Sequence, residues 1–297
     1  MIDFKEFSVL VQKTKLNLKT KDLIIFHKSV AQGLSSYWHP KPDKNKLIQL
    51  FYSDSWLKTE LSIVRKEILT WNKKHQIHIL SLDQPEYPKT LFKLTNPPPH
   101  LFIMGDFIES DHSLAIVGRR EAKPYTLKWM EDQLGLTLLK QRPLVISGGA
   151  RGVDSKAHQC ALMNNCKTIY VMPSGLLNLY PGALQKDYTS LIKSGATFIS
   201  TYLPEDPMRK QNFSDRNWII AALTQKILIL EAEIRSGSYK TAKYAIELGL
   251  DLGVVPSFPT DPTYSGSLQL LYEGASLIRD HQDLSVFLNF NENESLI

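Results

Sequence analysis

Glycine, serine and arginine residues gather at four points of the sequence where a short apolar run ends. The fullest group is Ser147-Gly148-Gly149-Ala150-Arg151-Gly152, directly after the apolar residues 144–146. Glycine lets backbone N–H groups approach an anion because it has no Cβ, and a helix N-terminus adds oriented N–H donors. Arginine forms forked hydrogen bonds to phosphate. This loop therefore predicts a phosphate-binding site.

Three further groups follow other apolar runs. They are Gly118-Arg119-Arg120, Ser174-Gly175 and Arg235-Ser236-Gly237-Ser238. Because the carboxyl ends of parallel strands share one edge of a sheet, we expect the four groups to form one broad phosphate-binding surface. The alternative is that each glycine turn is only a tight turn and each arginine a surface ion pair. Neither G-x-G-x-x-G nor a Walker A pattern is present, which disfavours nicotinamide cofactor binding and ATP hydrolysis.

A second group of binding residues lies in 210–218, after a proline-rich turn. Lys210 and Arg216 are cationic, Phe213 lies between them, and Asn217 follows. Two cations and an aromatic ring suit a nucleic acid single strand, since cations hold the backbone and the ring stacks on a base. The alternative is that Phe213 or Trp218 is a helix-start or core residue.

Residues suited to catalysis are few. Asp154 falls in the first turn of a predicted helix, where a carboxylate caps the helix or braces the preceding loop. His158, four residues later, reads as its i,i+4 neighbour on one helix face. Glu231 ends a buried strand and is predicted to brace the glycine loops. With no nucleophile–base pair and no metal cluster in the sequence, we expect a protein without catalysis, metal or cofactor.

Strand-length apolar runs alternate with helical patterns over most of the chain. The runs are 77–80, 101–105, 114–117, 144–146, 168–172, 197–199, 226–230 and 252–255, and helices are predicted over 127–139, 153–163 and 238–248. Short, fully apolar strands between helices indicate a parallel sheet covered on both faces. The predicted fold is α/β, an extended Rossmann-like, doubly wound and mostly parallel sheet preceded by a small helical domain.

The predicted domains are a helical N-terminal domain (1–76), the Rossmann-like domain (77–286) and a tail (287–297). Leu57, Leu61, Val64, Ile68 and Trp71 follow steps of four and three, which is typical of an amphipathic helix. His39-Pro40-Lys41-Pro42 divides the helical segment into two parts. We expect no winged-helix domain in the tail.

Composition indicates an ordinary globular protein with a basic N-terminal part. The 297 residues carry a net charge of +5, and residues 1–84 hold 14 Lys/Arg against 8 Asp/Glu. This excess weakly favours an anionic partner, although solvated helix lysines explain it as well. Cys160 and Cys166 are expected to be buried thiols in a reducing cytoplasm. Because no apolar run approaches the roughly 20 residues of a membrane span, we expect a cytoplasmic protein without a membrane partner.

These motifs, in this order, resemble the DprA/Smf family of bacterial DNA-processing proteins, over about residues 77–278. The matching segments are Asp83-x-x-x-Tyr87-Pro88 with the proline run and Gly105, Ile116-Val117-Gly118-x-Arg120, Ser147-Gly148-Gly149-Ala150-Arg151-Gly152-Val153-Asp154, Ser174-Gly175-Leu176 with Tyr180-Pro181, Phe213-x-x-Arg216-Asn217-x-Ile219-Ile220-Ala221, Glu231-Ala232, and Arg235-Ser236-Gly237-Ser238 with Thr241-Ala242.

The resemblance implies a non-catalytic, dimeric protein that binds and protects single-stranded DNA and helps to load RecA recombinase during natural transformation. It implies DNA contacts at Arg120, the 147–152 loop, Lys210 and Phe213. One alternative is a nucleotide-processing enzyme similar to phosphoribohydrolases, although the Pro-Gly-Gly-x-Gly-Thr type of loop that such enzymes need is absent. Another is a degenerate member that serves only as a protein partner.

Four positions depart from the family pattern. Trp218 replaces a usual arginine, Ser257 a usual glycine, and Leu268 and Leu184 usual asparagines. These changes fall partly on the predicted binding surface, so they bear on affinity and on coupling to RecA more than on the fold.

Overall fold

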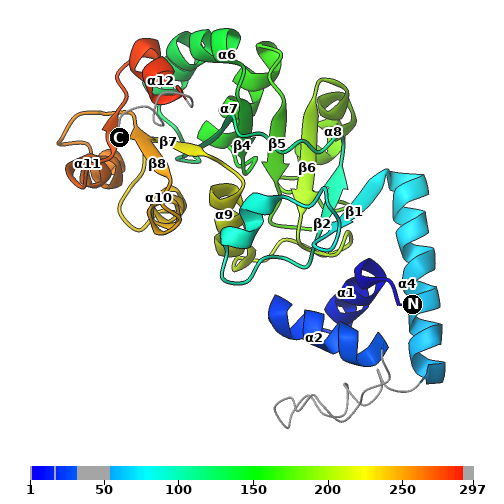
Figure 1. The fold of residues 1–297 in the computed structure, drawn as a ribbon. Coiled ribbons are helices and arrows are strands. Elements are labelled where there is room, and N and C mark those ends of the chain that lie inside the picture. The colour runs from blue at the N-terminus through cyan, green and yellow to red at the C-terminus, as the bar shows by residue number, and fades with distance from the viewer. Residues whose placement is uncertain (1, 17, 32–53, 290–297) are drawn as a thin grey trace.

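The computed structural model describes residues 2–16, 18–31 and 54–289. The predicted break at 39–42 and the end of the predicted tail, 290–297, lie outside the described residues. Within the described part, one mixed sheet has nine strands in the order β1-β2-β6-β5-β4-β3-β7-β8-β9 (Figure 1). The strands are β1 (Ile77–Ser81), β2 (His100–Met104), β3 (Ser113–Gly118), β4 (Leu144–Ser147), β5 (Thr168–Val171), β6 (Ala196–Ser200), β7 (Lys226–Leu230), β8 (Asp251–Val254) and β9 (Ser276–Leu277).

The pairing of the strands is mostly parallel. The pairs among β3 to β9 are all parallel, whereas β1 pairs with β2, and β2 with β6, in antiparallel register. The α/β fold class with a mostly parallel sheet is therefore confirmed. β3 lies between β4 and β7, so the strand order reverses beside it. Such a switch point leaves a crevice at the carboxyl ends of the strands, where ligands of α/β proteins bind.

Helices cover both faces of the sheet. They are α1 (Phe4–Lys13), α2 (Thr20–Ala31), α4 (Asp54–His75), η3 (Lys89–Lys93), α5 (Pro124–Trp129), η4 (Met130–Leu134), α6 (Gly135–Gln141), α7 (Val153–Met163), α8 (Leu184–Lys193), α9 (Asn212–Ala222), α10 (Gly237–Glu247), η5 (Pro262–Tyr264), α11 (Ser265–Tyr272) and α12 (His281–Phe287). The prediction of a helix over 153–163 matches α7 at both ends.

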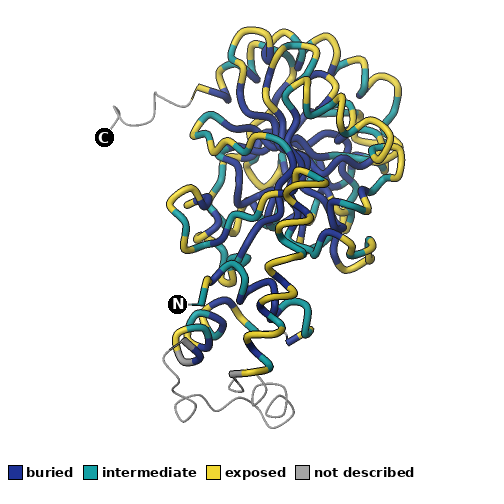
Figure 2. Tube along the Cα trace, turned by 90° about the vertical axis from the view of Figure 1, so that its right-hand side faces the viewer, coloured by how far each residue is buried: buried dark blue, intermediate teal, exposed yellow. Residues whose placement is uncertain are grey.

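Alternate residues of each central strand face opposite layers. In β3, Leu114 and Ile116 pack against α6, α7 and α12, whereas Ala115 and Val117 pack in the layer that holds α9 and α10. Figure 2 shows the resulting buried centre, with most exposed residues on the outer helices and loops. Burial on both faces explains why the strands are continuous apolar runs in the sequence.

The N-terminal helices share a hydrophobic core with one end of the sheet. Phe7 of α1 and Phe26 of α2 belong to the same buried cluster as Phe102 of β2 and Phe198 of β6. The predicted domain boundary at 76/77 falls between α4 and β1, and buried residues on both sides of it contact this cluster. None of the helices in the described ranges is long and apolar enough to span a membrane.

One buried hydroxyl fixes the start of the switch-point strand. Thr224 Oγ1 accepts the Ala115 N–H at 2.9 Å and donates to the Lys226 carbonyl at 2.8 Å.

Replacing Thr224 by valine leaves the Ala115 N–H unpaired in the core, so we expect a loss of about 1–3 kcal/mol in the free energy of unfolding. Urea denaturation measures it. The control Thr224→Ser keeps the hydroxyl and should lose less; equal losses for both variants would contradict this account.

Candidate functional site

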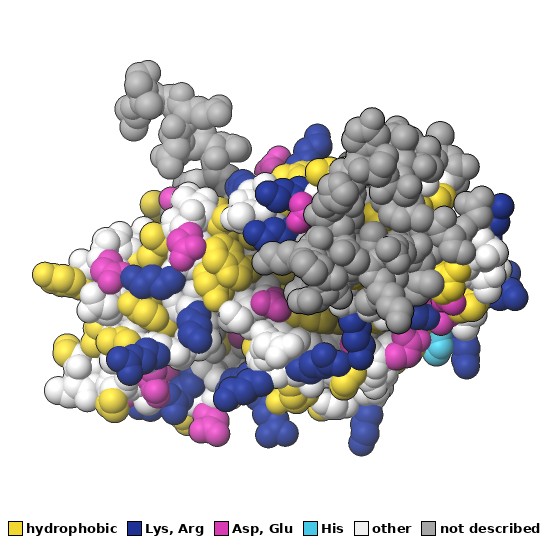
Figure 3. All heavy atoms as spheres, turned by 90° about the horizontal axis from the view of Figure 1, so that it is seen from below, with side chains coloured by type: hydrophobic (Ala, Val, Ile, Leu, Met, Phe, Trp, Pro, Cys, Tyr) yellow, Lys and Arg dark blue, Asp and Glu magenta, His cyan; other side chains and the backbone are white. Residues whose placement is uncertain are grey.

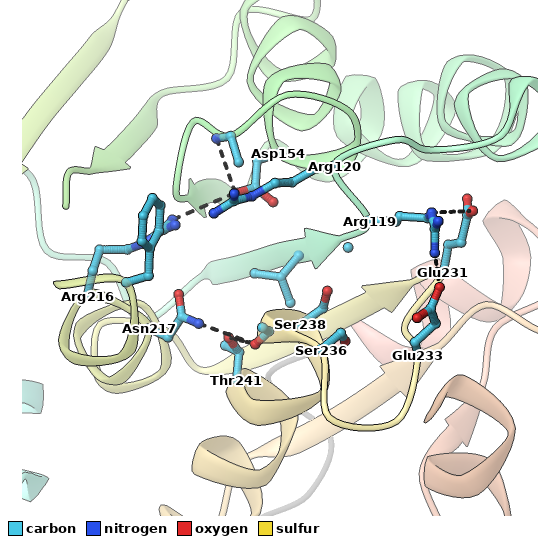
Figure 4. Close-up of a pocket in the computed structure, with 15 residues that line it drawn as sticks. Arg119, Arg120, Asp154, Arg216, Asn217, Glu231, Glu233, Ser236, Ser238 and Thr241 are labelled. Carbon is cyan, nitrogen blue, oxygen red and sulfur yellow. Dashed lines mark hydrogen bonds and ion pairs between the residues drawn. The ribbon is translucent and has the colours of Figure 1, made fainter. Parts of the chain in front are cut away.

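A cleft of about 260 Å³ opens at the carboxyl end of β3, at the switch point of the sheet (Figure 4). Its walls come from the end of β3, the loop after β4, the loop after β7, and the first turns of α9 and α10. Nine of the predicted phosphate-binding residues line it: Gly118, Arg119, Arg120, Phe213, Arg216, Asn217, Ser236, Gly237 and Ser238. The fold thus brings together residues separated by more than 100 positions.

A buried ion pair lies beneath the glycine loop. Arg216 and Asp154 are each 6% exposed, and Arg216 Nη1 lies 3.7 Å from Asp154 Oδ2. A Cβ on Gly148 would overlap the Arg216 guanidinium, so this position has room only for glycine. The sequence predicts Arg216 as a DNA contact, and in the structure Asp154 lies beside its guanidinium (Figure 4).

Burial shifts the pKa values of both partners toward the neutral forms. Burial raises the pKa of the Asp154 carboxyl, and Arg216 opposes that shift. Burial likewise lowers the pKa of the Arg216 guanidinium, and Asp154 opposes it. Asp154 also accepts the Ala150 N–H at 3.3 Å. The carboxylate therefore holds the 147–152 loop and the Arg216 side chain together.

His158 is not the surface neighbour of Asp154 that an i,i+4 reading suggests. It is fully buried, its ring stacks on Tyr170 with centroids 3.4 Å apart, and its Nδ1 lies 2.7 Å from Thr168 Oγ1. Burial lowers the pKa of His158 to about 3, so the ring is neutral at physiological pH. This histidine supports the floor beneath the loop.

Five of the predicted phosphate-binding residues are buried: Ser147, Gly148, Gly149, Ser174 and Gly175. Ser147 donates its hydroxyl to the Ile116 carbonyl at 2.6 Å, and Gly148 and Gly149 are buried beside it. Ser174 is fully buried, and the Gly175 N–H donates to the Asp206 carbonyl at 2.9 Å. Arg151 is exposed and Gly152 half-buried, so only the far end of the 147–152 loop reaches the surface.

Arg120 and Phe213 form the mouth of the cleft. Arg120 is exposed, and its guanidinium carbon lies 4.6 Å from the centre of the half-buried Phe213 ring. Arg216 approaches the same ring at 5.7 Å, and Tyr180 contacts it edge-on at 5.7 Å between centroids. A cation held over an aromatic ring is a stable arrangement, so the charge of Arg120 is fixed in place beside the ring.

Arg119, next in sequence to Arg120, has carboxylate partners instead. It pairs with Glu233 and lies 3.6 Å from Glu231 (Figure 4). Glu231 Oε2 accepts both the Lys123 N–H and the Thr126 hydroxyl at 2.9 Å. Glu231 thus holds the start of α5 and the Arg119 side chain. The predicted role of Arg119 as a phosphate ligand competes with these two carboxylates.

The first turn of α10 forms the opposite wall. Ser236 caps the helix by accepting the Tyr239 N–H at 3.2 Å, while Gly237 is exposed and Ser238 buried. Asn217 Nδ2 donates to the Gly237 carbonyl at 3.2 Å, which ties α9 to this turn. Backbone N–H groups at a helix start attract anions, so this wall suits a phosphate.

Four of the predicted phosphate-binding cations are exposed: Arg120, which lines the cleft, and Arg151, Lys210 and Arg235, which lie within three residues of lining residues. Within the part of the chain that the structure describes, none of the four forms an ion pair. Viewed from below, basic side chains form a broken row with acidic and hydrophobic groups between them (Figure 3). Trp218 is half-buried and stacks on Tyr244 with centroids 4.0 Å apart, so its ring already has a protein partner.

Sequence reasoning missed two side chains of the site. Glu233 lines the cleft as the partner of Arg119, and Tyr180 supports the Phe213 ring. Glu233 stands two residues after Glu231, directly after a predicted strand. Its place in the same loop as Glu231 indicates that it lies close to the predicted site. Among the described residues, no three His, Cys, Asp or Glu side chains gather as a metal site would require.

The Arg216–Asp154 pair predicts a pH-dependent stability change. Replacing Arg216 by methionine leaves a buried carboxylate without its partner, which costs about 3–5 kcal/mol at neutral pH. The folded-state pKa of Asp154 then rises further. At or below about pH 4, where an unfolded aspartate is protonated, the penalty is small, and it grows as the pH rises.

Guanidinium denaturation at pH 4 and pH 7.5 tests whether the destabilisation by Arg216→Met grows as the pH rises. The control is the double variant Arg216→Met with Asp154→Asn, which removes the orphaned charge and should flatten the pH dependence. A destabilisation by Arg216→Met that is equal at both pH values would refute the account.

Comparisons with known proteins agree with the sequence motifs and the fold. The Smf protein of Escherichia coli is 33% identical over 236 residues, which cover 77% of this chain and 62% of that protein. DNA processing protein DprA of Streptococcus pneumoniae is 33% identical over 205 residues, covering 69% of this chain and 72% of that protein. This chain thus spans less than two thirds of the Escherichia coli relative.

Two solved structures are similar over most of their length. The X-ray structure of Streptococcus pneumoniae DprA has a TM-score of 0.74 and 26% identity, covering 96% of this chain and 98% of that one. Helicobacter pylori DprA, whose structure describes its single-stranded DNA binding mode, has a TM-score of 0.64 and 29% identity, covering 72% and 95%. The family model "DNA recombination-mediator protein A" matches residues 78–289, and the chain therefore belongs to the DprA/Smf family.

Proposed function

We propose that this chain binds single-stranded DNA across the cleft at the carboxyl edge of its sheet. The observation that carries the proposal is the placement of the exposed Arg120 guanidinium 4.6 Å from the Phe213 ring centre. Lys210 is exposed one turn before Phe213 at the start of α9. Cations beside an aromatic ring match the backbone and one base of the same nucleotide.

The chemistry of this surface favours a nucleic acid backbone over a sequence-reading role. Arg120, Lys210 and the α10 N-terminus offer donors to phosphate, and such contacts carry no sequence information. Every base can stack on an aromatic ring, and a base reaches the Phe213 ring when it takes the place of the Arg120 guanidinium, which lies over that ring. We therefore expect binding that depends weakly on base sequence and strongly on salt concentration.

The carboxylates of the cleft support binding rather than catalysis. Asp154 is matched by Arg216, Glu231 accepts from Lys123 and Thr126, and Glu233 pairs with Arg119. A general base needs a carboxylate within hydrogen-bond reach of a substrate proton, and all three are engaged by protein partners. We infer that this family member acts by binding DNA and not as a nucleotide-processing enzyme.

The wider role is part of the same proposal. The family is a DNA-processing family, and the Helicobacter pylori relative is described by its single-stranded DNA binding mode. We infer that this chain protects incoming DNA in the cytoplasm, acts as a homodimer and helps to load RecA recombinase. An exposed cleft with unpaired cations leaves a bound strand accessible to a second protein, which such loading requires.

Arg120→Ala and Lys210→Ala test the phosphate contacts. Each variant should weaken binding to a fluorescent oligo-dT and lower the slope of log affinity against log salt by about 0.7. Fluorescence anisotropy at several salt concentrations measures both quantities. Lys140→Ala removes an exposed lysine on α6, away from the cleft, and should leave the slope almost unchanged. Absence of wild-type binding at low salt would refute the proposed function.

Phe213→Ala tests base stacking separately from charge. We expect a loss of about 1–3 kcal/mol in binding free energy, as for other base–aromatic stacks, with the salt slope retained. Phe213→Leu keeps apolar bulk beside Arg120 without an aromatic face, so it should recover only a minor part of the affinity. The same anisotropy titration measures both variants. If the leucine variant binds as tightly as wild type, Phe213 is a packing residue.

A further inference from the structure

The loop of residues 201–211 joins β6 to α9 and carries Lys210 at its end. Side chains of two N-terminal helices hydrogen-bond to this loop, although they lie far from it in sequence. We propose that the N-terminal helices position the DNA-contacting start of α9, with Trp71 and Gln12 as the positioning residues. This inference rests on the proposed function and assigns a role to the N-terminal segment.

Trp71 of α4 makes the first contact. Its indole Nε1–H donates to Glu205 Oε1 at 2.6 Å, while its ring is 4% exposed and packs edge-on against Phe102 of β2 at 5.7 Å. Glu205 itself is exposed, and its carbonyl accepts from Asn178 Nδ2 at 2.5 Å. A rigid, buried indole thus holds an exposed carboxylate of the loop.

Gln12 of α1 makes the second contact through a chain of hydrogen bonds. Gln12 Nε2 donates to the Thr201 carbonyl at 3.0 Å, and its Oε1 accepts from His100 Nε2 at 2.7 Å. His100 Nδ1 in turn lies 2.8 Å from Ser8 Oγ. Because an amide oxygen only accepts, His100 Nε2 carries the proton of this bond. Burial lowers the pKa of His100 to about 3, so its ring is neutral at physiological pH.

The loop between these two contacts is itself well braced. The Leu177 N–H donates to the Pro204 carbonyl at 2.8 Å, and the Leu203 N–H donates to Asp206 Oδ2 at 3.1 Å. At its far end, Asn212 Nδ2 donates to the Pro173 carbonyl at 2.8 Å. One of these bonds lies within the loop, and the other two tie it to the 173–177 segment. Because these bonds restrict the loop, a shift where Trp71 and Gln12 hold it displaces Lys210 and Phe213.

The charge of Glu205 and its hydrogen bond from Trp71 predict opposite effects on DNA affinity when the carboxylate is removed. Removing an exposed carboxylate close to a DNA-binding surface tightens DNA binding if only the charge matters. If the hydrogen bond from Trp71 matters, its removal weakens binding. Glu205→Gln removes the charge but keeps an oxygen acceptor for the indole, whereas Glu205→Ala removes both. This pair of variants at an exposed position separates the two effects.

The test measures oligo-dT affinity by anisotropy. Glu205→Ala and Trp71→Phe should each weaken binding about three- to tenfold, the range of one hydrogen bond, while Glu205→Gln binds at least as tightly as wild type. The double variant of Trp71→Phe with Glu205→Ala should bind no more weakly than either single variant, because both remove one contact. In a Lys210→Ala, Phe213→Ala background, Glu205→Ala should have no further effect.

Equal affinities for Glu205→Ala and Glu205→Gln, or additive losses in the double variant, overturn the proposal. Amide hydrogen exchange provides a second readout without DNA. The 201–211 loop should exchange faster in Glu205→Ala than in Glu205→Gln, with unchanged protection in β3 and β7. If wild type fails to bind DNA, the proposed function falls while this exchange comparison still decides the positioning role, and equal exchange in the two variants overturns it.

Discussion

The buried pair of Arg216 and Asp154 is the constraint on which the cleft depends. Taking two charges out of water is costly, and only their mutual attraction and further hydrogen bonds repay that cost. The pair therefore fixes where α9 lies relative to the loop after β4, because any separation leaves a buried charge. The pair also requires glycine at position 148, because a Cβ there would occupy the space of the Arg216 guanidinium.

This constraint explains why the loop that looks most like an anion cradle is only partly one. Its first residues are committed to the ion pair and to the floor formed by His158 and Tyr170, so they lie buried. The exposed binding groups come instead from its neighbours, above all Arg120 and the start of α9. The cleft is thus a rigid base with a charged and aromatic mouth.

Local sequence patterns predicted the fold well, but they did not predict which side chains of the site pair with other protein groups and which stay exposed. The strands are apolar runs because both sheet faces are buried, and helix α7 follows directly from its position after the glycine loop. By contrast, Arg119 and Arg120 are adjacent and chemically identical. They differ in their partners: Arg119 pairs with Glu231 and Glu233, more than 100 residues later, whereas Arg120 lies over the Phe213 ring. Such long-range partners leave no trace in local periodicity.

The shared hydrophobic core has a consequence for synthesis on the ribosome. Phe4 and Phe7 are buried in the same cluster as Phe198, which is made almost 200 residues later. At about 5–20 residues per second, the N-terminal helices wait on the order of 10–40 s for this partner surface. During that interval their apolar faces have only partners from the N-terminal segment itself, such as Phe26 and His27.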